Sequence, residues 1–204
     1  MQSEAPGRRQ RLRAATQMQH TELDALIERA QHFASLDGYV AWLQGGYSFH
    51  RAIEQDLTQR GFGDLLKQTG LTLRAELLRQ DLADLGLVPK TAPNAMAPGP
   101  CNEAEALGVL YVTEGAALGA RVLLLRARSL GLSEKYGARQ LTQAAHDLQS
   151  WRRFVMLLDG TDCACEDEER VVDAARRTFA VALAHLTQPT SPHRNDRASM
   201  TGPQ

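Results

Sequence analysis

The chain has 204 residues, the length of one domain, and its 23 basic and 24 acidic residues leave a net charge of −1. This balance excludes an overall field that would gather nucleic acid or an anionic membrane. The three cysteines are an odd number and so form no complete set of disulfides. Two of them, Cys163 and Cys165, form a Cys-x-Cys pair, but the second pair typical of a zinc site is missing. No apolar stretch approaches the ~20 residues of a membrane span, and the basic start has no apolar signal core. We therefore expect a soluble, cytoplasmic protein with reduced thiols.

The first half of the chain shows hydrophobic periods of three to four residues and no alternating strand pattern, which predicts helices. Three are expected, over residues 9–30, 35–59 and 71–85. Ser35 is a candidate N-cap of the second helix, and Gly45-Gly46 a possible bend in it. The segment 89–100 contains four prolines, so it is predicted to be a loop.

The second half predicts three more helices. Asn102 and Glu105 resemble a capping box that opens a helix reaching about residue 130. The next is expected over 133–158, and the last begins with acidic residues at 166–169 and ends near Leu186. Residues 1–187 therefore form one all-α domain, a compact multi-helix bundle, and the polar, Pro/Ser-containing residues 188–204 are expected to be a disordered tail.

Two glycines, Gly115 and Gly119, interrupt the otherwise apolar helix of the second half. Each costs about 1 kcal/mol relative to alanine, and their spacing of four leaves one helical face without side chains. Such a face allows a close approach to something flat. The spacing alone favours the alternative, tight packing of another helix, because small-residue spacing is common at helix crossings.

His20 lies on the apolar stripe of the first predicted helix, with Thr16 and Leu23. Its imidazole is therefore expected to face the interior. Periodicity alone favours a core histidine held by one hydrogen bond, so a metal-ligand role needs a second observation.

Three segments supply that observation. Residues 12–20, Leu-Arg-Ala-Ala-Thr-Gln-Met-Gln-His, resemble the opening helix of heme oxygenases, which carries the heme-ligating histidine. Residues 110–119, Leu-Tyr-Val-Thr-Glu-Gly-Ala-Ala-Leu-Gly, resemble the glycine-rich distal helix of the same family, closest to its bacterial, biliverdin-producing branch associated with bacteriophytochromes. Residues 151–154, Trp-Arg-Arg-Phe, are a weaker match. The order and separation of the segments also fit, and the resemblance covers roughly residues 11–186.

The resemblance implies that heme lies between the first helix and a glycine-kinked distal helix. His20 would be the axial ligand of the iron, and Gly115 and Gly119 would let the backbone lie close over the opposite face, where the reaction occurs. The remaining residues expected to contact heme are Arg13 and Arg152 at the propionates, with Thr16 and Tyr111 from the matching segments.

The distal face distinguishes an oxygenase from a peroxidase, which needs a distal acid or base. Ala116, Ala117 and Leu118 offer neither, which favours the oxygenase, with ordered water donating the proton. Thr113 and Glu114 are the nearest polar side chains. Two positions depart from the family pattern: Ala116 stands where some members carry an aspartate, and Ala120 where many carry a third glycine.

The implied reaction is the oxidative cleavage of heme, both substrate and cofactor, to biliverdin, CO and ferrous iron, using O2. The chain has no flavin or nicotinamide motif, so its electrons must come from an external donor, a ferredoxin or an NAD(P)H-dependent reductase. A bacteriophytochrome is a possible bilin acceptor.

Two other readings of the chain stay open at this point. The first is a heme carrier or sensor without turnover, which the missing aspartate favours. The second is a helical interaction protein, in which the glycines form a helix crossing and His20 is a core residue. A thiamine-degrading enzyme of similar fold would need a nucleophilic cysteine, and Cys101, Cys163 and Cys165 are not placed for it.

Overall fold

The structure, a computed structural model, describes residues 7–69, 74–90, 97–162 and 164–187, and this part of the chain is helical without a β-strand. The expected all-α class is therefore confirmed. The predicted tail over 188–204 lies outside the described residues. In chain order the elements are α1 (Arg8–Ala15), α2 (Gln17–Arg29), α3 (Leu36–Gln59), α4 (Gly63–Thr69), α5 (Arg74–Asp84), α6 (Glu103–Gly115), the 3₁₀ turn η1 (Ala116–Leu118), α7 (Ala120–Ser129), α8 (Arg139–His146), α9 (Leu148–Gly160) and α10 (Cys165–Leu186).

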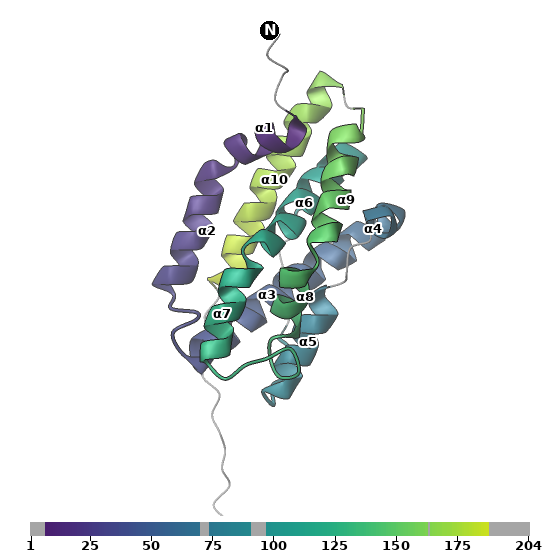
Figure 1. The fold of residues 1–204 in the computed structure, drawn as a ribbon. Coiled ribbons are helices and arrows are strands. Elements are labelled where there is room, and N and C mark those ends of the chain that lie inside the picture. The colour runs from purple at the N-terminus through teal and green to yellow at the C-terminus, as the bar shows by residue number, and fades with distance from the viewer. Residues whose placement is uncertain (1–6, 70–73, 91–96, 163, 188–204) are drawn as a thin grey trace, which may run out of the picture.

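The bundle is built around α6 and α10, which pack along each other at its centre (Figure 1). Gly108 lies at their crossing, where a Cβ atom would come within 2.3 Å of the Val171 carbonyl oxygen. Gly45 serves the same purpose between α3 and α10, with the His185 carbonyl at 2.8 Å. Helix α3 continues through both glycines of the possible bend, and Gly45 allows a close approach of two backbones.

The helix predicted over residues 9–30 is two helices, α1 and α2, which meet at Thr16. Thr16 leaves helical geometry, with φ −114° and ψ 12°, and its hydroxyl donates to the Leu12 carbonyl at 2.8 Å. The Ala15 carbonyl accepts instead from the Arg176 guanidinium of α10, at 3.3 Å. Because the Arg176 guanidinium satisfies the Ala15 carbonyl, the chain can turn here, and Figure 1 shows the two helices at an angle.

The helix predicted to reach residue 130 also divides, into α6, η1 and α7, and its two halves are bent by 48°. Asn102 caps α6 as expected, accepting from the Glu105 amide at 2.9 Å. No single described helix has the length and apolar composition of a membrane span. Only Glu103–Leu118 combined with Ala120–Ser129, across the bend, reaches that composition.

The helix predicted over residues 133–158 begins later and divides at Asp147. Residues 133–137 form a turn, α8 begins at Arg139, and Asp147 caps α9 by accepting from the Ser150 amide at 3.1 Å. The third predicted helix is confirmed as α5 from Arg74 onwards, and its predicted start at residue 71 lies outside the described residues. The sequence analysis missed α4 altogether.

Candidate functional site

His20 lies in the first turn of α2, just after the break at Thr16, with its ring half-buried. The ring meets that of Phe179 on α10 edge to face, with centroids 4.6 Å apart. Burial lowers the pKa of His20, the carboxylate of Asp24 opposes this, and the guanidinium of Arg13 adds to it. The imidazole is therefore neutral at pH 7, the form that binds a metal.

The residues expected beside His20 are brought together by the break between α1 and α2. Burial raises the pKa of Tyr111 on α6, and the neighbouring Thr16 side chain lowers it in part. The positive charge of Arg13 acts on both His20 and Tyr111, so the three groups are neighbours. The helix predicted over residues 9–30 would have carried both Arg13 and His20, but in the structure they belong to different helices, α1 and α2.

Arg9 is a cation that the sequence analysis missed. Its charge, like that of Arg13, lowers the pKa of Tyr111. One turn separates the two arginines on α1, and the spacing of four was the signal that could have paired them. Arg152 is exposed on α9, and its charge is not among those that shift the pKa of His20 or Tyr111. The structure does not bring Arg152 into this group.

Gly115 and Gly119 stand at the two ends of the bend, and nothing in the described chain fills the space beside them. A Cβ atom on Gly115 would meet only the ring edge of Trp151 at 3.9 Å, and one on Gly119 only the Ala116 carbonyl at 3.9 Å. Both residues have right-handed helical dihedral angles, which any residue adopts. These glycines are therefore explained neither by backbone conformation nor by helix packing, in contrast to Gly108.

The surface beside the bend is apolar and exposed. Leu118 and Val122 follow Gly115 along one side of η1 and α7, and their side chains are 55% and 57% exposed. Arg126, one turn further, forms an ion pair with Glu28 of α2. This side of α7 therefore faces the helix that carries His20.

The Glu114 side chain points towards α5, and the Thr113 hydroxyl donates to the Leu110 carbonyl of its own helix. Arg74, the first residue of α5, donates to the Thr113 carbonyl and, at 3.2 Å, to the Glu114 carboxylate. Both side chains of this ion pair are buried. Burial raises the pKa of Glu114, against the effect of Arg74, and the charge of Asp147 raises it further. The Arg74 guanidinium thus caps the C-terminal end of α6 where the bend begins.

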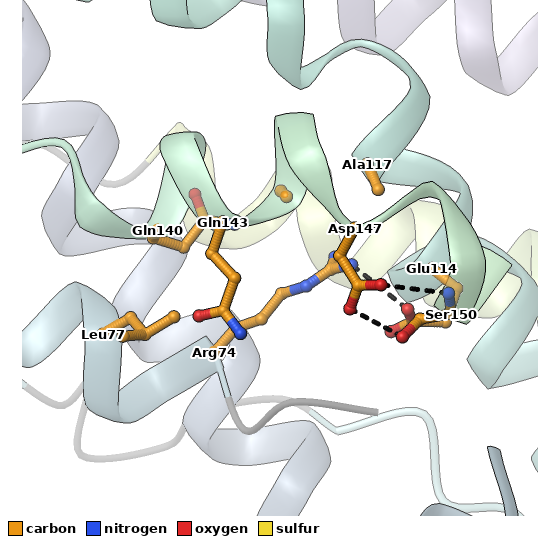
Figure 2. Close-up of a pocket in the computed structure, with 9 residues that line it drawn as sticks. Arg74, Leu77, Glu114, Ala117, Gln140, Gln143, Asp147 and Ser150 are labelled. Carbon is orange, nitrogen blue, oxygen red and sulfur yellow. Dashed lines mark hydrogen bonds and ion pairs between the residues drawn. The ribbon is translucent and has the colours of Figure 1, made fainter. Parts of the chain in front are cut away.

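A small polar cavity of about 20 Å³, room for roughly one ordered water, lies behind the bend (Figure 2). Arg74, Glu114, Asp147 and Gln140 line it, with Ala117 from η1. The buried Gln140 Oε1 has no hydrogen-bond partner among the described residues. The sequence signal for this arrangement is Glu114, a carboxylate inside the apolar α6. A buried carboxylate requires a cation as its partner, and the sequence alone does not identify Arg74 as that cation.

Several features of the described chain bear on ligand binding. His20 offers one neutral nitrogen donor, the space beside Gly115 and Gly119 is open, and Arg9 and Arg13 supply positive charge near Tyr111. In the described part of the chain no three His, Cys, Asp or Glu side chains converge on a metal position.

The fold defines an all-helical protein with a half-buried, neutral histidine on α2 and two glycines at the bend between α6 and α7. The heme oxygenase family model matches residues 8–187, and the chain belongs to this family.

Three similar proteins support the assignment. Heme oxygenase PigA of Pseudomonas aeruginosa is 32% identical over 84% of this chain and 87% of its own length. A heme oxygenase of Xanthomonas campestris is 37% identical over 54% of this chain and 60% of its own. The heme oxygenase of Neisseria meningitidis, solved with NO and CO bound, has a TM-score of 0.76 and 31% identity, covering 89% of this chain and 91% of its own.

Proposed function

We propose that this protein cleaves heme oxidatively to biliverdin, CO and ferrous iron, with the heme held between His20 and the bend at Gly115 and Gly119. The family membership carries the activity, because the full-length match covers both the histidine helix and the glycine helix. The observation that carries the site is the unfilled space beside two glycines of ordinary helical conformation.

Heme supplies the iron at which O2 is activated, and its own ring is the part that is oxidised. The residues of this chain bind and orient it. His20, kept neutral by burial, would hold the iron from one side, and Phe179 fixes the plane of its ring. Arg13 would bind a propionate, and Thr16 and Tyr111 would hold the adjoining edge, while Arg152 stays a second propionate candidate.

The bend would act by shape. Exposed Leu118 and the bare backbone at Gly119 form an apolar roof without an acid or base, so bound oxygen would be directed towards one edge of the ring. Gly115 and Gly119 are the positions through which we expect the chain to control the chemistry.

The proposal extends to an electron supply from a ferredoxin or an NAD(P)H-dependent reductase in the cytoplasm, and to a bacteriophytochrome as acceptor of the bilin. The resemblance of the His20 and Gly115 segments to the bacterial branch of the family supports these partners.

A hemin titration followed by ascorbate under air, in one cuvette, tests the activity. We expect a stoichiometric Soret band that decays into a bilin absorption in the red. A Soret band that persists under ascorbate would indicate a heme carrier. No Soret band at all would show that neither heme binding nor cleavage belongs to this chain.

A further inference from the structure

Helix α7 links the proposed heme face to a second, outer surface. Three residues, Ala120, Leu124 and Ala127, fix it to the protein core, since each is at most 4% exposed. A second side of α7 carries Val122 and Arg126 and faces α2. Figure 1 shows α7 between α2 and α8, so its third side looks outward from the heme face.

That third side carries Arg121, Leu125 and Arg128, at the spacing of one helical face. With His146 and Leu148 from the junction of α8 and α9, they line an open groove of about 380 Å³, which we call the α7 groove. Leu125 is 66% and Leu148 40% exposed, which makes the groove apolar at its centre.

The charge of the α7 groove has one sign. None of the residues that line it is acidic. Within the described residues, neither Arg121 nor Arg128 forms an ion pair, whereas neighbouring Arg126 does. Because the whole chain has a net charge of only −1, these cations are a local feature and not part of a general basic field. Exposed apolar side chains between unpaired cations are typical of a surface that binds an acidic protein.

We propose that the α7 groove is the docking site of an acidic electron-donor protein of the ferredoxin class. The inference rests on the proposed function, which requires electrons that the chain has no cofactor of its own to supply. The groove is placed for this role because α7 begins directly after Gly119, so a donor seated on Arg121 and Leu125 lies on the helix that follows the roof of the proposed heme face. In each transfer, one electron leaves the reduced iron–sulfur cluster of the donor and converts ferric heme iron to ferrous.

The test uses the full chain loaded with hemin and two electron sources. One is ascorbate, which needs no docking site, and the other is an acidic [2Fe–2S] ferredoxin with its NADPH-dependent reductase. The variant is Arg121→Glu/Arg128→Glu. The control is Lys67→Glu/Lys90→Glu, which changes the net charge equally with exposed lysines outside the groove. Leu125→Ser tests the apolar centre without a change in charge.

We expect all variants to cleave heme with ascorbate at the rate of the unsubstituted protein. With ferredoxin, Arg121→Glu/Arg128→Glu should raise the KM for ferredoxin about tenfold or more and lose the salt dependence of the rate, whereas the lysine control should retain both. Leu125→Ser should raise the KM less and keep the salt dependence.

Three results would overturn the docking site. The first is equal ferredoxin kinetics for the arginine variant and the lysine control. The second is turnover with ascorbate but none with ferredoxin in the unsubstituted protein. The third is a change of oligomeric state in sedimentation on charge reversal, which would assign the groove to a second copy of the chain. Failure of ascorbate to drive cleavage would instead contradict the proposed function itself.

Discussion

At the scale of single residues, glycine has opposite purposes at Gly108 inside α6 and at Gly115 and Gly119 beside the bend. Gly108 is required by the chain itself, because the Val171 carbonyl occupies the position of its missing side chain. Gly115 and Gly119 are required by nothing in the described chain. A glycine that costs stability without a structural gain indicates a ligand that needs the space.

Gly119→Leu tests this distinction. We expect a free energy of unfolding within about 1 kcal/mol of the unsubstituted protein, because the space is open and leucine is the better helix former. Hemin affinity should fall at least ~tenfold, because the side chain takes the place of the ligand. Urea unfolding and hemin titration measure the two quantities. Gly108→Ala is the control and should lose about 2 kcal/mol or more of stability through overpacking.

His20→Ala should remove the histidine-ligated Soret spectrum while leaving the fold intact, because the ring is only half-buried. In the unsubstituted protein, hemin affinity should be nearly constant above about pH 7.5, one unit above the ordinary histidine pKa, where His20 is neutral. Since burial lowers the pKa of His20, the fall in affinity at lower pH should come later than for an ordinary histidine, as protons compete for the nitrogen. Hemin titrations between pH 5 and 8 measure this. Normal heme binding and cleavage by His20→Ala without added imidazole would contradict the ligand assignment.

At the scale of the elements, the breaks between helices decide where the site lies. The family motifs located His20 and both glycines from sequence, yet each predicted helix that carries them is divided in the structure. The breaks depend on side chains distant in sequence: Arg176 takes the Ala15 carbonyl, and Arg74 takes that of Thr113. Helix α8 likewise begins where Asp81 of α5 accepts from the Arg139 and Gln140 amides, at 2.8 and 3.0 Å. Local patterns predicted the local caps, Ser35 and Asn102, and could not predict these long-range ones.

The Arg74 cap can be tested through its ion pair with Glu114. Arg74→Met should lower the free energy of unfolding by about 3–5 kcal/mol, because it leaves a buried carboxylate unpaired. Adding Glu114→Met should restore part of the loss, since no buried charge then remains. Urea unfolding of both variants measures this. If the second substitution lowered stability further, the ion pair would not be the reason for the loss.

At the scale of the whole molecule, buried titratable groups tie stability to pH in two opposing ways. Burial lowers the pKa of His32 and His50 in the folded protein. Below pH 6.5 the unfolded chain therefore binds more protons than the folded one, and stability decreases as the pH is lowered. Burial raises the pKa of Glu54 and Asp81, so their contribution is present below the ordinary carboxyl pKa and is lost as pH rises through the raised value.

A comparison with His50→Gln separates the two effects. As pH falls from 6.5 towards the lowered pKa of His50, the unsubstituted protein should lose about 1.4 kcal/mol per pH unit relative to this variant. Urea unfolding at pH 7.5, 6.5 and 5.5 measures the difference. His146→Gln is the control, because His146 is exposed, and its profile should run parallel to that of the unsubstituted protein. A parallel profile for His50→Gln would show that His50 is not the group responsible.

We propose that the protein as a whole holds heme between α2 and the bend of α6 and α7, and a crystal structure of the hemin complex tests this most directly. We predict the iron bound to the imidazole of His20, the opposite face of the ring against Gly115 and Gly119, and a propionate within reach of Arg13. Iron bound by another histidine, or heme seated on a different surface with the space beside Gly119 still open, would contradict the account.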